Sequence, residues 1–193
     1  MHLTETSPVP SAALPVALLR DHLRLSSGFA DDTTQDALLE QYLRAALGRI
    51  EARLSRALFR RGYVLRLAQW RNGQTQALLI APVLQITSVT VLAADGSALP
   101  VAASRYRLDP DSTRPRIMAA GTALPTIPTG GAVEIAFDAG FGVTWDDIPA
   151  DLRQAVLLLA AHFYEARDAA GAIAPSIASL LERWQDIRLG GRP

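Results

Sequence analysis

Two pairs of carboxylates are the first candidates for chemistry in this sequence. Asp109 and Asp111, and likewise Asp146 and Asp147, lie close enough in sequence to act as an acid–base pair or to bind calcium. The first pair belongs to the run Asp-Pro-Asp-Ser, which is typical of a turn, and the second precedes Pro149, as the cap of a helix does. We therefore favour turn and cap roles for all four carboxylates. A hydrolase that acts through them is the less favoured alternative.

His162 and Glu165 are the next candidates, because residues three apart share one face of a helix and could both bind a metal ion. A metal site needs three or four ligands, however, and the neighbours Ala160, Ala161 and Phe163 are typical of a core. The chain contains no cysteine and none of the motifs GxSxG, GxxxxGK[ST] and HExxH. We therefore expect no catalytic residues, no cofactor and no metal ion, and a protein that is not an enzyme.

A stripe of arginines on one expected helix favours a binding function instead. At about 100° per residue, the four side chains fall within an arc roughly 60° wide, about 120° from the centre of the leucine face. Their neighbours four positions away are mostly alanines or one another, so we expect acids or phosphates from elsewhere. This arginine stripe consists of Arg49, Arg53, Arg56 and Arg60.

Three partners for the arginine stripe stay open. The first is an acidic surface of the same chain or of another subunit, the second is solvent alone, and the third is passing nucleic acid. The candidate acids are Asp31, Asp32, Asp36, Asp138, Asp146 and Asp147.

Composition limits the class of protein further. The 193 residues are 49% apolar, which is enough for one sizeable core or two small ones. All nineteen basic residues are arginine, yet the net charge is zero, so no overall field attracts nucleic acid or an anionic membrane. The N-terminus lacks the positive charge of a signal peptide, and no apolar run has the length of a membrane span. We expect no membrane contact.

The elements that would hold these residues begin with an arm and two helices. Residues 1–14 are interrupted by prolines and are expected to form a flexible arm. Pro15 suits the first turn of a short helix that runs to about Leu25. A second helix begins at Asp32 or the next residue, and its leucines recur at helical spacing as far as Leu58. This second helix carries the arginine stripe.

From Gly62 onwards the pattern changes to short β-rich runs. Turn dipeptides separate them, at Asn72-Gly73, Asp95-Gly96 and Gly130-Gly131. An antiparallel β unit is the simplest interpretation. The expected strands are residues 63–70, 77–80, 86–92, 106–108, 116–118 and 132–137.

Two further helices follow the strands. An acidic pair and Pro149 signal the start of a strongly apolar helix over residues 152–167. A last amphipathic helix is expected from Ser176 to about Ile187. Trp184 on this last helix is most simply a core anchor, although such aromatic residues are also favoured at interfaces.

The predicted fold class is α+β, a mainly helical bundle of N- and C-terminal helices with an inserted antiparallel β subdomain. In domain terms, residues 15–60 and 145–187 would form the helical body and residues 61–144 the β subdomain. Residues 1–14 would be the arm before this body, and residues 188–193 a C-terminal tail.

An ordered set of short sequences resembles one protein family. The set comprises residues 15–24 (PVALLRDHLR), 36–40 (DALLE), 45–57 (AALGRIEARLSRA), 86–91 (ITSVTV), 106–109 (YRLD), 137–142 (FDAGFG), 148–155 (IPADLRQA) and 162–165 (HFYE). None of them is specific by itself. Their order over residues 15–187 resembles the head-tail connector (adaptor) proteins of tailed phages and of phage-like gene transfer agents.

The resemblance implies a structural subunit that is made in the bacterial cytoplasm and resides in the neck of a virion or phage-like particle. Such subunits form a ring, usually of twelve copies, below the portal protein, and they link the DNA-containing head to the stopper or next neck protein. The resemblance also implies a mainly helical body with a β part between its helices. Another neck or tail-completion (stopper) protein is the alternative within the same particle.

Site residues also follow from the resemblance. The arginine stripe would lie either at a subunit boundary or toward the channel, where it would make non-specific contact with passing DNA. In this family C-terminal residues commonly reach into the portal. The residues that would dock to the portal are Trp184, Ile187, Arg188, Leu189 and Arg192.

Overall fold

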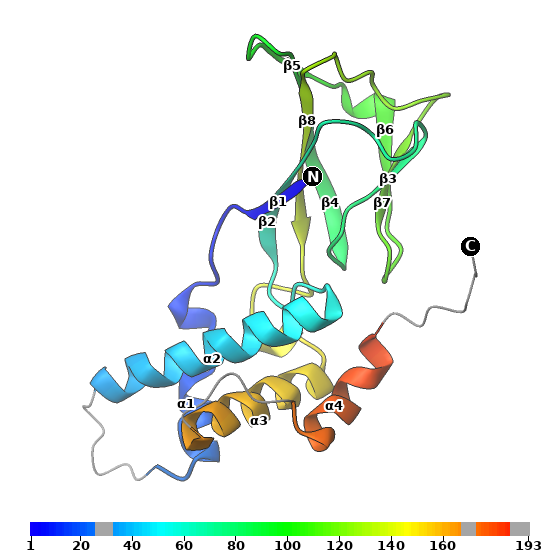
Figure 1. Ribbon diagram of the computed structural model, residues 1–193. Coiled ribbons are helices and arrows are strands. Elements are labelled where there is room, and N and C mark those ends of the chain that lie inside the picture. Colours follow the sequence, from blue (N-terminus) through cyan, green and yellow to red (C-terminus); the bar gives the residue numbers. More distant parts are fainter. Residues whose placement is uncertain (26–32, 167–172, 186–193) are drawn as a thin grey trace. The chain divides into compact units, whose positions relative to one another are not determined.

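A computed structural model describes residues 1–25, 33–166 and 173–185 of the chain (Figure 1). Within these residues it contains four α-helices and eight strands in two antiparallel sheets. The chain divides into two compact units, each made from two separate stretches of sequence. Unit 1 comprises Met1–Pro8 and Ser55–Phe141, and unit 2 comprises Val9–Leu54 and Gly142–Pro193.

Unit 1 contains both sheets. The larger sheet has five strands in the order β1-β2-β8-β4-β5, and the smaller has three in the order β3-β7-β6. All neighbouring strands are antiparallel. The strands are β1 His2–Glu5, β2 Arg61–Leu67, β3 Thr75–Ala77, β4 Val83–Leu92, β5 Ala98–Pro100, β6 Tyr106–Asp109, β7 Arg116–Ala119 and β8 Ala132–Ala139.

The core of unit 1 lies on one face of the central strand β8. Alternate residues of β8 are buried, and the register sets Phe137 opposite Tyr63 and Ile135 opposite Leu65 on β2. The rings of Tyr63 and Phe137 stack with their centroids 5.9 Å apart. Ile117 of the smaller sheet belongs to the same buried cluster. Apolar and polar residues alternate along these strands because one face of the sheet is buried and the other is not.

Unit 2 is helical. Helix α2 (Thr33–Leu54) packs against α3 (Ala150–Ala166), α1 (Val16–His22) contacts both, and α4 (Pro175–Leu181) packs on α3. The buried leucines of α2, together with Ile50, recur three or four residues apart, as the sequence pattern predicts. No described helix has the length and apolar character that crossing a membrane requires. Short 3-10 helices cover Ser11–Ala13, Trp145–Asp147 and Glu182–Trp184 in this unit, and Ala103–Arg105 in unit 1.

The expectation of a flexible arm over residues 1–14 is wrong. Strand β1 pairs with β2 from His2 opposite Arg66 to Glu5 opposite Tyr63. An ion pair between Glu5 and Arg61, 3.0 Å long, adds to this pairing. Polar residues dominate β1, so its backbone hydrogen bonds rather than any apolar pattern place it in the sheet.

The α+β class is confirmed, but a mainly helical bundle is not supported. Among the described residues there are only four α-helices against eight strands, and strand β1 precedes the first helix. The expected helical body also included residues 55–60, whereas the structure assigns them to unit 1. The last expected helix is shorter too, because α4 ends at Leu181 and a 3-10 turn follows.

Candidate assembly surfaces

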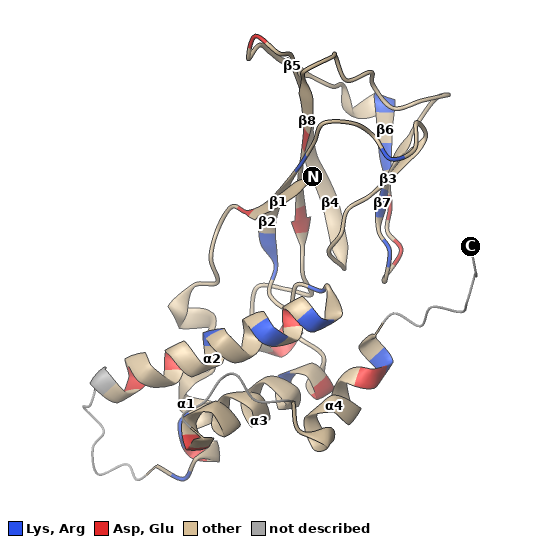
Figure 2. Cartoon of the chain, in the orientation of Figure 1, with Lys and Arg blue, Asp and Glu red and all other residues tan. Residues whose placement is uncertain are grey.

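Charges on α2 are divided along its length (Figure 2). Asp36 and Glu40 lie in its N-terminal half, whereas its C-terminal half carries Arg44, Arg49 and Arg53 together with one acid, Glu51. This order suits the helix dipole, which favours acids near the N-terminus and bases near the C-terminus. The side chain of Arg53 is exposed and that of Arg49 is half-buried. The C-terminal part of α2 therefore carries a net positive charge.

The arginine stripe is interrupted. Helix α2 ends before Ser55, whose φ of 53° lies in the left-handed region. The amide of Ala57 donates to the carbonyl of Ala81 at 2.8 Å instead of to the preceding helix. The prediction that all four arginines share one helix face is therefore wrong. Arg49 and Arg53 lie on α2, whereas Arg56 and Arg60 follow its end.

Arg56 is a buried structural residue. The residue is only 6% exposed. Nη1 donates to the carbonyl of Ser112 at 2.6 Å, and Nη2 donates to Oγ1 of Thr113 at 3.3 Å. These bonds satisfy a buried charge inside unit 1, as burial of a guanidinium requires. Arg56 thus fixes the loop before β7 and offers little surface to another molecule.

Arg60 has an acidic partner in its own chain. Nη2 of Arg60 lies 2.8 Å from Oδ2 of Asp138 on β8, and Nε2 of Gln85 donates to the same oxygen at 2.8 Å. The hydrogen bond from Arg60 holds the pKa of Asp138 below its ordinary value. Asp138 was one of the candidate acids, so the intrachain alternative describes Arg60.

The remaining candidate acids have local partners where the structure describes them. Asp36 pairs with Arg20 of α1, and Asp146 pairs with Arg153 of α3. Asp147 accepts from the backbone amide of Thr144 at 2.9 Å and from its hydroxyl at 2.8 Å, which lowers the pKa of Asp147. Thr144 and Asp147 form the capping box of the 3-10 helix Trp145–Asp147, which directly precedes α3. Asp31 and Asp32 lie outside the described residues.

The other candidates for chemistry also take structural positions. Oδ1 of Asp111 accepts from the amides of Thr113 and Arg114 at 2.8 and 2.7 Å, so it stabilises a turn, and these bonds lower its pKa. Asp109 lies 3.7 Å from Arg116. Across residues 1–25, 33–166 and 173–185, no three His, Cys, Asp or Glu side chains gather as a metal site would need.

Trp184 is tied to the helices of unit 2. Its indole Nε1 donates to Oδ2 of Asp151 at 2.8 Å, and the guanidinium of Arg183 lies 3.5 Å from the same oxygen. Asp151 belongs to the first turn of α3. Trp184 therefore fixes the end of the described chain to α3. The other residues expected to dock to the portal, Ile187, Arg188, Leu189 and Arg192, lie outside the described residues.

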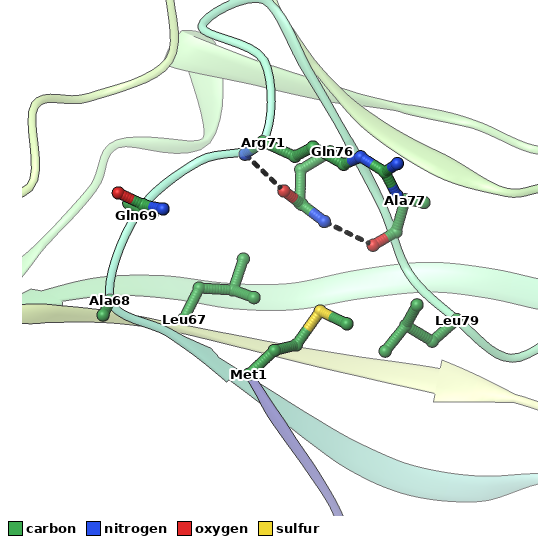
Figure 3. A pocket seen from close by; sticks show the side chains of 8 residues that line it. All are labelled: Met1, Leu67, Ala68, Gln69, Arg71, Gln76, Ala77 and Leu79. Carbon is green, nitrogen blue, oxygen red and sulfur yellow. Dashed lines mark hydrogen bonds between the residues drawn. The ribbon is translucent and has the colours of Figure 1, made fainter. Parts of the chain in front are cut away.

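Unit 1 contains an open pocket of about 350 Å³. Figure 3 shows Met1, Leu67 and Leu79 on one side of it and the polar side chains of Arg71 and Gln76 on the other. Gln76 is buried, and its amide accepts from the backbone of Arg71 at 3.0 Å and donates to a backbone carbonyl at 3.1 Å. This pocket could not be predicted from the sequence, because its walls come from three separate segments, which no local pattern connects.

Three solved structures resemble the chain over its full length. A chain of a structure described as "Neck of empty GTA particle computed with C6 symmetry" is 54% identical, with a TM-score of 0.91. A chain of "Virion of native gene transfer agent (GTA) particle" is 53% identical, with a TM-score of 0.88. A chain of "Neck of native GTA particle computed with C12 symmetry" is 50% identical, with a TM-score of 0.87. Each match covers 100% of both chains. No family model and no curated protein matches the sequence.

Proposed function

Because the chain belongs to the head-tail connector family of phage-like gene transfer agent necks, we propose that it is the adaptor subunit of such a neck. In this role it forms a ring below the portal protein and joins the DNA-containing head to the stopper or next neck protein. Its contribution is structural and involves no catalysis. The observation that carries the proposal is the full-length identity of 50–54% to chains of these particles.

A ring of twelve copies is the assembly that fits best. The similar structures are necks described with sixfold and with twelvefold symmetry, and a twelvefold ring also satisfies sixfold symmetry. A net charge of zero supports such a ring, because identical copies then repel one another little when they pack side by side.

A structural role also agrees with how the polar side chains are used. The carboxylates that could have formed a catalytic pair are engaged in a turn, a cap and ion pairs. They are therefore committed to holding the backbone in place. This use of carboxylates is what an assembly protein needs and leaves the hydrolase alternative without support.

Two surfaces are proposed to meet neighbours in the neck. The C-terminal residues dock to the portal, with Trp184 fixing the start of the segment through Asp151 and with Ile187, Arg188, Leu189 and Arg192 making the contact. The exposed Arg53 and its neighbour Arg49 face either an adjacent subunit or the DNA channel. Arg56 and Arg60 lie in unit 1, where Arg56 bonds to Ser112 and Arg60 pairs with Asp138, and they do not belong to these surfaces.

Removal of the gene tests the adaptor role. We expect DNA-filled heads without tails, because the link below the portal is missing. Micrographs of complete particles should show a ring of this protein directly against the portal. A ring one level further from the head would identify a stopper instead, and heads that carry tails normally without the protein would refute the proposal.

Charge removal tests the surface on α2. Arg49 and Arg53 changed together to glutamine should leave the chain folded but lower ring assembly or DNA delivery. The matched control removes two exposed arginines of unit 1, Arg105 and Arg107. Equal particle yield and gene transfer in the two variants would contradict a role for the α2 surface.

Likewise, deletion of residues 188–193 should weaken portal binding in a pull-down, and unchanged binding would contradict C-terminal docking.

A further inference from the structure

The five-stranded sheet of unit 1 presents a leucine at one of its edges. Strand β5 is the last strand of the sheet, and Leu99 in it is 69% exposed. The preceding turn is well formed, with Gly96 at a φ of 85° and the Ser97 amide donating to Oδ1 of Asp95 at 2.9 Å. The hairpin therefore holds an apolar side chain and a carboxylate in a fixed relation to each other. A single exposed leucine is ordinary, so its meaning depends on the opposite edge.

The pocket of unit 1 lies at that opposite edge. Strand β1 is the other outer strand of the same sheet, and Met1, which directly precedes it, lines the pocket together with Leu67 at the end of β2. The third apolar residue, Leu79, is 42% exposed and has a φ of 66°, a conformation that costs a leucine roughly 1 kcal/mol or more. Its backbone thus holds an apolar side chain at the mouth of the pocket. The pocket has a volume of about 350 Å³, which is large enough to hold one leucine side chain.

Charges accompany both the leucine and the pocket. Arg71 is exposed at the rim of the pocket, and Asp95 is exposed on the hairpin. Hydrogen bonds from Ser97 lower the pKa of Asp95, so it is negative at neutral pH. Within the described parts of the chain, neither Arg71 nor Asp95 has an ion-pair partner. One edge therefore carries an exposed leucine and a negative charge, and the other carries a partly apolar pocket and a positive charge.

We propose that these two edges join neighbouring copies of the chain in the ring. Leu99 of one copy enters the pocket of the next, where it meets Met1, Leu67 and Leu79, and Asp95 pairs with Arg71. The inference rests on the proposed function, because it needs a ring of copies. A contact between two different surfaces of one chain repeats in a single direction until the ring closes. Opposite edges of one sheet meet this requirement, whereas a self-complementary patch would stop at a dimer.

Pro100 explains why side chains rather than backbones make this contact. An exposed edge strand can pair with another strand, but proline has no amide to donate. Strand β5 ends in Pro100 and is only three residues long, so it offers little template for strand addition. The hairpin is thus protected against uncontrolled edge pairing, and Leu99 supplies specificity by filling a pocket.

A designed disulfide tests the contact directly. The chain has no cysteine, so Leu99→Cys together with Leu79→Cys reports on this contact alone. Mild oxidation of assembled particles should produce a ladder of linked chains on a non-reducing gel, up to the full ring, whereas each single variant should not. The matched control pairs Leu99→Cys with Leu38→Cys, since Leu38 of unit 2 is 41% exposed, and it should give no ladder.

The possible outcomes separate this inference from the proposed function. Particles that contain the double variant but give no ladder would overturn the contact and leave the adaptor role intact. An equal ladder from the Leu38 control would also overturn it, because the contact would not be specific. Absence of the wild-type protein from particles would refute the proposed function instead.

A double-mutant cycle on Asp95 and Arg71 tests the inference if the cysteine variants do not assemble. Asp95→Asn keeps the oxygen that stabilises the turn, and Arg71→Gln keeps a polar side chain at the rim. Each single change should lower incorporation into particles about two- to fivefold, and the two together should lower it no further, since both remove one ion pair. The proposed ion pair would be overturned if the double variant lost incorporation by the product of the two single losses. It would also be overturned if neither single variant lost incorporation.

Discussion

Replacement of Arg56 by methionine should destabilise unit 1 markedly. Arg56 is 6% exposed, and its guanidinium donates to the carbonyl of Ser112 at 2.6 Å and to the hydroxyl of Thr113 at 3.3 Å. Methionine keeps most of the aliphatic length but donates nothing. The variant therefore leaves the Ser112 carbonyl without its charged donor while the surrounding packing is largely retained.

The expected loss is about 2 kcal/mol. A hydrogen bond from a charged donor contributes roughly 1.5–3 kcal/mol, and the longer bond to Thr113 adds little. Removal of a buried positive charge offsets part of this loss, because its desolvation no longer has to be overcome. For a unit of roughly one hundred residues, this free energy corresponds to a fall in melting temperature of about 10 °C.

Thermal and denaturant unfolding of the full chain measure this loss, and hydrogen exchange of the Thr113 and Arg114 amides reports whether the loop opens. The matched control is Arg53→Met, on the exposed part of α2, which should change stability by less than about 0.5 kcal/mol. Equal melting temperatures for the two variants would refute the reasoning, because a buried donor would then contribute no more than an exposed arginine.

Three further changes, the last with a control, have defined outcomes. Asp138→Asn should lower the unfolding free energy at neutral pH, because only the ionised form of Asp138 is stabilised by its partners. The difference from wild type should vanish as the pH falls from about 4 through the lowered pKa of Asp138, and unfolding measured across this pH range checks it. Trp184→Phe should cost about 1 kcal/mol through its lost bond to Asp151, measured by denaturant unfolding. Gly140→Ala should cost about 3 kcal/mol or more, because Gly140 has a φ of 128° and an added Cβ would lie 2.2 Å from a backbone oxygen. Gly121→Ala, which meets nothing within 4 Å, should keep the wild-type melting temperature and soluble yield.

Strands with one buried face could be predicted from the sequence, and the two outer strands of the five-stranded sheet could not. The runs over residues 86–92 and 132–137 overlap β4 and β8, because burial of alternate residues leaves a period of two in the sequence. Strands β1 and β5 have few buried side chains and are held by backbone bonds to β2 and β4. Backbone bonds leave no such period, so these two strands were missed.

The arginine stripe shows a different limit. Leu54 and Leu58 are spaced as in a helix and both are buried, so the periodicity continues although the helix has ended. The left-handed conformation of Ser55 causes the break, and serine gives no sign of it as a glycine would. The partner of Arg60 was also beyond prediction as a specific contact, because Asp138 lies 78 residues further along the chain.

The division of the chain into two interleaved units also orders its synthesis. The backbone passes from one unit to the other after Pro8, after Leu54 and after Phe141. Strand β1 is made before α1 and α2, yet its partner β2 is made only after them, so β1 has to stay unpaired while two helices of the other unit appear. Unit 1 can close once Phe141 is available, whereas α2 lacks its partner until α3 (Ala150–Ala166) has also been made. Nascent chains stalled just before α3 should therefore carry protease-resistant sheets and a still-sensitive α2.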